Sequence, residues 1–235
     1  MDILTKFVEE VKAVYGKNLL SIILYGSRAS GEETKKYSDY NLLIVLEEIK
    51  FSDLKLITRP IKNWVKQGNP APLFFTSARL KTSADVFPIE FLDIKDKHKV
   101  LFGDDLFLGL EIKHTHLRHE CEFELKGKLL KLRQGYILSG NKPKLVRKLL
   151  IDSLSAVLVV FRHSLRLFGQ TPPLKKIDSL ELLAKRIGLD ASVFLAVHKM
   201  KNGDKEANKI DPDGLMEKYL QQIEKVVEAV DNLKA

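Results

Sequence analysis

The sequence is poor in cysteine and in long apolar runs. Cys121 is the only cysteine among the 235 residues, so the chain forms no internal disulfide. The longest nearly apolar stretch, residues 149–161, is interrupted by Asp152, whereas a transmembrane helix needs about 20 apolar residues. The first residues mix acidic and basic side chains with apolar ones, unlike a signal peptide. These absences predict a cytoplasmic protein with no membrane partner.

The composition is that of a globular protein, with 45% hydrophobic and 30% charged residues. Its net charge of +8 is unevenly placed, because residues 1–110 hold 16 Lys and Arg against 15 Asp and Glu, whereas the rest hold 23 against 16. A basic second half suits a phosphate-bearing partner, although a solvated basic surface explains it equally well. That half carries no stripe of aromatic residues among its bases, which argues against a nucleic-acid-binding module.

The first half of the chain mixes strand and helix patterns. Short apolar runs with β-branched residues, bounded by glycine or polar residues, predict strands at 21–25, 41–46, 72–76 and 87–94. Apolar residues three or four apart predict a helix before Gly16, another at 51–67 that is kinked or begun near Pro60, and a turn or two at 77–85. We therefore expect an α+β domain with about four strands.

The second half is helical throughout. Apolar residues recur at helical spacing over 114–138, 144–168, 179–187, 191–200 and 213–233. The segment at 144–168 is apolar on most of its faces, so we expect it at the centre of a helical bundle. A glycine-marked stretch at 103–109 separates the halves, and we predict an α+β domain at 1–107 and an all-α domain at 108–235.

Chemistry is concentrated where the first two predicted strands end and begin. The first strand leads into Gly26, Ser27 and Arg28. Glycine lets the backbone approach a ligand, and a serine hydroxyl with turn amides binds phosphate oxygens, to which Arg28 adds positive charge. Asp39 and Asn41 open the second strand two residues apart, so their side chains are expected on one face. Their oxygen atoms are the ligands that Mg²⁺ prefers.

These motifs resemble the nucleotidyltransferase superfamily of the DNA polymerase β type, in particular its minimal members with a C-terminal helical domain. In that family a Gly-Ser motif follows a strand, and Asp-x-Asp opens the next strand. Gly26 and Ser27 match the first motif, Asp39 matches the first carboxylate, and Asn41 stands where the second is expected. The resemblance implies a nucleotidyltransferase-like mixed sheet with flanking helices, followed by a helical bundle.

The family also carries a third carboxylate on a later strand. Glu90, in the predicted strand 87–94, is the residue that resembles it, with Asp93 as the alternative. The resemblance implies that Asp39, Asn41 and Glu90 ligate the metal and that Asp39 and Glu90 are catalytic, Glu90 helping to deprotonate the attacking hydroxyl. Glu90 is one methylene longer than the usual aspartate, so its reach differs.

Two functions follow from the resemblance. The first is an enzyme that binds a nucleoside triphosphate (NTP) with Mg²⁺ and transfers a nucleoside monophosphate to an acceptor hydroxyl. The second is a degenerate, non-catalytic member that binds nucleotide or a protein partner as a regulator, because Asn41 lacks the formal charge of the expected aspartate. Family members modify small molecules, RNA ends and proteins, so the acceptor stays open, as does the oligomeric state.

Overall fold

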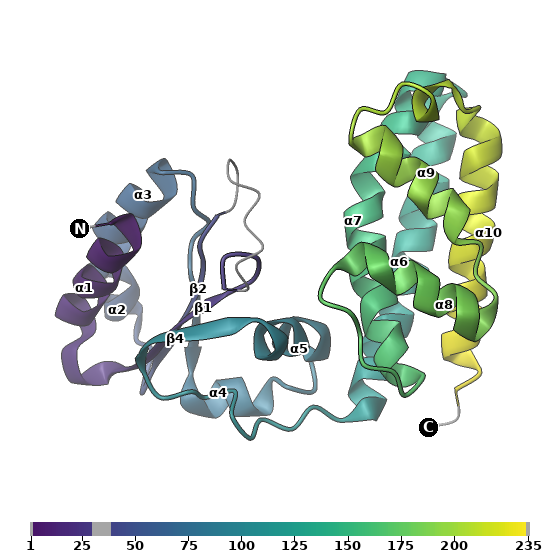
Figure 1. Cartoon of the computed structure of the whole chain (residues 1–235). Helices are drawn as coiled ribbons and strands as arrows, with labels where there is room; N and C mark the ends of the chain where they lie inside the picture. Colours follow the sequence, from purple (N-terminus) through teal and green to yellow (C-terminus); the bar gives the residue numbers. More distant parts are fainter. Residues whose placement is uncertain (1, 30–38, 234–235) are drawn as a thin grey trace. The chain divides into compact units, whose positions relative to one another are not determined.

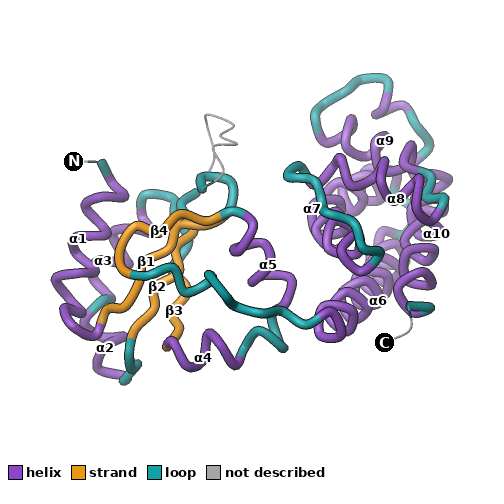
Figure 2. Tube along the Cα trace, turned by 60° about the horizontal axis from the view of Figure 1, so that its bottom comes forward, coloured by secondary structure: helices purple, strands orange, loops and turns teal. Residues whose placement is uncertain are grey.

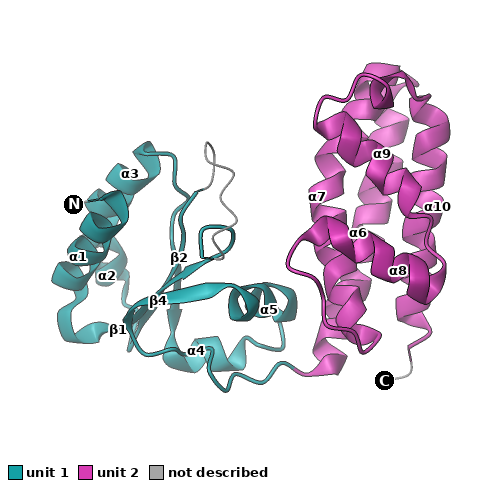
Figure 3. Cartoon of the chain, viewed as in Figure 1, with its two compact units in different colours: residues 1–112 teal, residues 113–235 magenta. Residues whose placement is uncertain are grey.

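The computed structural model describes residues 2–29 and 39–233. It divides into two compact units, residues 1–112 and 113–235, which are described separately (Figure 3). Ser38, which precedes Asp39 in the sequence motif, lies outside the described residues.

Unit 1 is built on a mixed sheet, as the sequence predicts. In the described residues four strands form one sheet in the order β3-β2-β1-β4 (Figures 1 and 2). β1 is antiparallel to both β2 and β4, whereas β2 and β3 are parallel. The strands are β1 (Leu19–Tyr25), β2 (Asn41–Leu46), β3 (Leu73–Thr76) and β4 (His98–Gly103). The two central strands are therefore those that carry the Gly-Ser motif and Asn41.

Alternating side chains of the central strands form two cores, one on each face of the sheet. On one face Ile22, Leu24 and Ile44 pack in a cluster with Phe7 of α1 and Trp64 of α3. The helices whose residues enter this cluster are α1 (Ile3–Tyr15) and α3 (Thr58–Lys66), with α2 (Phe51–Leu56) preceding α3. The predicted helix at 51–67 is thus divided at Ile57, because Pro60 is accommodated in the first turn of a new helix.

The opposite face of the sheet is covered by a second set of elements. Ile23, Leu43 and Val45 share a cluster with Phe91 of α5 and Phe107. The two helices of this face are α4 (Ser77–Thr82) and α5 (Pro88–Asp96). This face matters for the site because Asn41 belongs to the same side of β2 as Leu43 and Val45.

The prediction of a strand at 87–94 is wrong, because Pro88 and the residues after it form the helix α5 (Pro88–Asp96). Pro88 occupies the first helical position, where its missing N–H is harmless. Pro88, Phe91 and Ile94 are spaced by three and are buried together, so the apolar residues satisfy a helical period. The last strand is instead β4 (His98–Gly103), in a segment for which the sequence analysis predicts no strand.

The described residues of unit 2 form helices and their connections. From Val157 to its end, the long helix α7 (Pro143–Leu167) is buried on nearly all faces, as the sequence predicts for the central helix of a bundle, whereas its first half also carries exposed positions. The helices are α6 (His114–Ser139), α7 (Pro143–Leu167), α8 (Ser179–Ile187), α9 (Ala191–Lys201) and α10 (Pro212–Asp231). Over the part of the chain that the structure describes, no helix is long and apolar enough to cross a membrane.

Candidate functional site

Three strand ends meet at one edge of the sheet. Tyr25, the last residue of β1, pairs with Asn41 at the start of β2 and with His98 at the start of β4. Directly paired residues of antiparallel strands place their side chains on the same face. Tyr25, Asn41 and His98 therefore share the face that α5 covers. Burial raises the pKa of Tyr25, so its phenol stays neutral there.

Gly26 begins a tight turn immediately after β1. Its φ of +81° lies in the region that favours glycine, and its carbonyl accepts a hydrogen bond from Ala29 N at 3.0 Å. Its N–H donates to the Lys97 carbonyl at 3.2 Å, which ties the turn to the corner between α5 and β4. A Cβ placed on Gly26 would lie 3.2 Å from Asn41 Nδ2. The Gly-Ser turn and Asn41, 15 positions apart, are thus adjacent in space.

The other motif residues surround this turn. Ser27, in the turn, is exposed, and so is Asp39, two residues before the start of β2. Asn41 is half-buried between the turn and the sheet. Gly26, its neighbour Ser27 and Asn41 therefore lie at one edge of the sheet.

Arg28 is anchored by an aromatic side chain that the sequence motif does not include. Its guanidinium lies 4.1 Å from the centre of the Tyr40 ring, and one Nη donates to the Tyr40 hydroxyl at 3.0 Å. The Tyr40 backbone N–H donates to Asn69 Oδ1 at 3.1 Å, and its ring packs 5.9 Å from that of Trp64. Tyr40 packs in the core on the face of the sheet opposite α5. Arg28 is therefore held from that face, whereas the Asn41 side chain lies on the face that α5 covers.

The proposed third carboxylate stands on a helix. Glu90 lies in the first turn of α5 and is exposed, whereas Asp93 lies one turn later and is half-buried. Within residues 2–29 and 39–233, no group of three or more His, Cys, Asp or Glu side chains is gathered as a metal site. α5 covers the face of the sheet on which Asn41 lies. Glu90 is not carried to the sheet edge by a strand as expected, because residues 88–96 form this helix.

The oxygen atoms of Asp39 and Asn41 suit a single Mg²⁺ ion. Mg²⁺ is typically held by one or two protein carboxylates, substrate phosphates and water. Asp39, two residues before β2, and Asn41, at its start next to the Gly26 turn, carry the carboxylate and amide oxygens of such a donor set. They carry less negative charge than two aspartates, so they suit a pair of ions less well.

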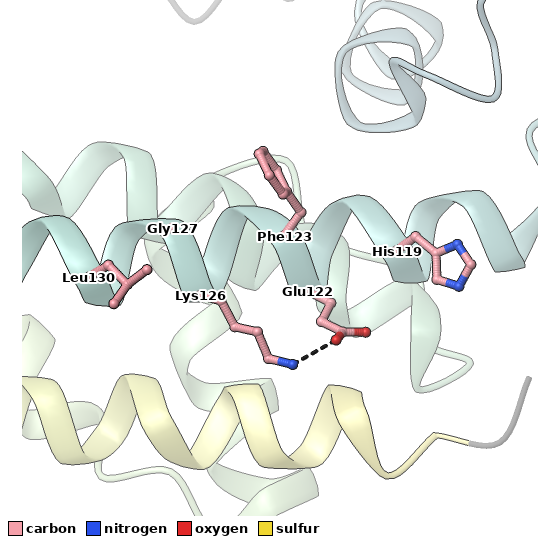
Figure 4. Close-up of a pocket in the computed structure, with 6 residues that line it drawn as sticks. All are labelled: His119, Glu122, Phe123, Lys126, Gly127 and Leu130. Atoms are coloured by element: carbon pink, nitrogen blue, oxygen red, sulfur yellow. Dashed lines mark hydrogen bonds and ion pairs between the residues drawn. The ribbon is translucent and has the colours of Figure 1, made fainter.

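The basic residues of α6 are engaged within unit 2. Lys126 contacts Glu122 at 2.6 Å and Asp231 of α10 at 3.0 Å, and both Glu122 and Lys126 line a shallow pocket on one face of α6 (Figure 4). Arg118 lies 3.7 Å from Glu122, and Arg133 pairs with Glu224 of α10. These side chains have the contacts of an ordinary charged helix surface.

The chain matches no family model and no curated protein sequence. Among solved structures it is similar to spectinomycin adenyltransferase AAD(9) from Enterococcus faecialis, a crystal structure with ATP and spectinomycin, with a TM-score of 0.54. The similarity covers 92% of this chain and 99% of that one at 14% identity. The chain therefore shares the fold of that adenyltransferase. This fold confirms the architecture that the resemblance predicts, namely a mixed sheet with flanking helices followed by a helical region.

Proposed function

We propose that the chain binds a nucleoside triphosphate with Mg²⁺ and transfers the nucleoside monophosphate to an acceptor hydroxyl, releasing pyrophosphate. One observation carries this proposal: the Gly26 turn lies against Asn41 at the edge of a sheet with the nucleotidyltransferase fold. The adenyltransferase with that fold was solved with ATP and a small-molecule acceptor, which supports a nucleotide substrate here. We assign the nucleotide chemistry to residues 1–107 and the choice of acceptor to residues 108–235.

Each motif residue has a role in this proposal. The Gly26 and Ser27 backbone, with the Ser27 hydroxyl, binds phosphate oxygens, and Arg28 adds positive charge from its position on Tyr40. Asp39, Asn41 and Glu90 supply oxygen ligands for Mg²⁺, which neutralises charge on the phosphates. Asp39 and Glu90 are the catalytic carboxylates, with Glu90 accepting the proton of the attacking hydroxyl. Positioning for in-line attack supplies most of the rate enhancement.

Asn41 favours a second function, nucleotide binding without turnover. A neutral amide removes one of the charges that hold two divalent ions close together. It also removes repulsion toward the triphosphate, so nucleotide binding is retained when turnover is lost. Such a chain would act as a nucleotide-dependent regulator or protein-interaction module.

Calorimetric titration with ATP and the other triphosphates, with and without Mg²⁺, tests the proposal. Magnesium-dependent binding favours the enzyme, whereas binding that ignores Mg²⁺ favours the regulator. The absence of binding for every triphosphate under both conditions contradicts both.

The substitution Asn41→Asp tests the metal position. A second carboxylate beside Asp39 should tighten Mn²⁺ or Mg²⁺ binding several-fold, because negative charge attracts the ion. Asn63→Asp, at an exposed position on α3, adds the same charge to unit 1 on a helix that packs on the opposite face of the sheet from Asn41, and it is the matched control. If both variants bind metal like the native chain, Asn41 is not a metal ligand.

A further inference from the structure

The His98 ring lies between two hydrogen-bond acceptors. Its Nδ1 is 3.0 Å from the carbonyl oxygen of Ile94, in the last turn of α5. Its Nε2 is 3.1 Å from Oδ2 of Asp105, in the segment after β4. The ring also packs 5.8 Å from the buried ring of Phe107. His98 therefore joins the end of α5, the start of β4 and the 105–107 segment.

These contacts hold the ring from two sides. A carbonyl oxygen only accepts hydrogen bonds, so the ring donates from Nδ1 to Ile94. Burial acts to raise the pKa of Asp105, but hydrogen bonds from His98 and from the Phe107 N–H outweigh it and hold that pKa below its usual value. The Asp105 carboxylate is thus ionised and lies within hydrogen-bond distance of Nε2.

The residue before His98 holds the Gly-Ser turn. The Lys97 N–H donates to the carbonyls of Asp93 and Ile94 at 3.3 and 3.1 Å, which fixes this peptide against the end of α5. The Lys97 carbonyl, one bond from His98, accepts the hydrogen bond from Gly26 N. Fixing the ring of His98 therefore fixes the acceptor on which the Gly26 turn rests.

We propose that His98, held by its contacts with Ile94 and Asp105, is a positioning residue for the Gly26–Ser27 turn. The ring does not touch the nucleotide in this scheme. It acts through the Lys97 carbonyl, which orients the turn so that its amides face the phosphates. The nucleotide part of the proposal rests on the proposed function, whereas the effect on the turn does not.

The Nδ1 hydrogen bond is measured on the native chain by ¹⁵N NMR of selectively labelled histidine. We expect Nδ1 of His98 to carry a proton, because it faces the Ile94 carbonyl. A native ring whose Nδ1 carries no proton would overturn the proposal.

Two substitutions separate the two hydrogen bonds. His98→Asn retains a donor near the position of Nδ1, and His98→Gln retains one near Nε2, so each variant loses one of the two ring contacts. Lys99→Gln removes a positive charge from an exposed neighbour on the same strand and serves as the control. We expect amide hydrogen exchange at Gly26 to rise about tenfold in both His98 variants, with ATP binding about tenfold weaker, and neither to change in the control. Asp105→Asn should act in the same direction, which covers the case of a His98 variant that does not fold.

The two readouts distinguish failure of this proposal from failure of the proposed function. If the native chain binds no triphosphate, the proposed function fails, and the Gly26 exchange rate alone decides the role of His98. If the native chain binds ATP and the His98 variants bind it equally well with unchanged Gly26 exchange, His98 is not a positioning residue.

Discussion

Replacing Gly26 by alanine tests whether the close approach of the turn to Asn41 is functional. At φ +81° an L-residue is strained by about 1–2 kcal/mol. The new Cβ would also lie 3.2 Å from Asn41 Nδ2, which is tighter than ordinary contact, so the amide must move by a few tenths of an ångström. We therefore expect unit 1 to lose about 1–2 kcal/mol of stability and Asn41 to be displaced.

Gly109 provides a matched control within the same unit. Its φ is +82°, and a Cβ there would meet nothing within 4 Å. Gly109→Ala should therefore carry the same backbone cost without disturbing Asn41. Denaturant unfolding measures the stability of both variants, and calorimetry measures ATP binding. We expect a larger stability loss in Gly26→Ala than in Gly109→Ala, because the contact with Asn41 adds to the backbone strain. We expect weaker ATP binding, by about tenfold or more, only in Gly26→Ala.

Equal ATP affinity in the two alanine variants would refute the reasoning, since the crowding of Asn41 would then have no effect on the nucleotide. A third variant, Gly26→Ala combined with Asn41→Ala, locates the cause. Removing the amide relieves the contact but leaves the backbone strain, so the stability difference from Gly109→Ala should vanish.

Further predictions concern buried residues in both units. Burial raises the pKa of the Cys121 thiol to about 12, so a disulfide reagent at pH 8 should label it only after unfolding. The stability that this burial contributes is complete below about pH 9 and is lost as the pH rises toward 12. Phe7→Ala should cost about 3–5 kcal/mol, because Phe7 is buried and stacks 4.4 Å from Trp64, whose fluorescence reports the loss. Tyr219→Phe removes the hydroxyl that lies 3.2 Å from Ser153 Oγ. The substitution should lower the free energy of unfolding by about 1 kcal/mol, which circular dichroism of the unfolding chain measures. An unchanged unfolding midpoint in Phe7→Ala or in Tyr219→Phe would contradict the corresponding prediction.

Periodicity predicted most of the elements because their burial is one-sided or complete. The long helices α6 and α7 carry enough turns to distinguish a period near 3.6 from one of two. The short segment 87–96 does not, since Phe87, Ile89 and Phe91 also alternate as in a strand. Pro88 at a helix start and the spacing of three to Phe91 were the available signals for α5.

The contacts that hold the site could not be read from local patterns. The contact between Arg28 and Tyr40 depends on Asn69 and Trp64, which meet Tyr40 only through the tertiary fold. The hydrogen bond from Gly26 to Lys97 spans 71 positions, and nothing in the composition around Lys97 indicates it. Gly26, Ser27 and Asn41 were predictable because the strands that carry them are adjacent in the sheet.

The position of Asn41 links the fold to the choice between the two proposed functions. Its side chain faces the same side of the sheet as α5, the helix that carries both Glu90 and Asp93. A carboxylate on a helix is placed by the packing of that helix, here by Phe91 and Ile94, rather than by strand register. The charge that Asn41 lacks would then have to be supplied from α5. Glu90→Gln removes that charge at an exposed position without loosening α5. It should weaken metal binding if the enzyme function holds, and it should leave magnesium-independent nucleotide binding unchanged if the regulator function holds.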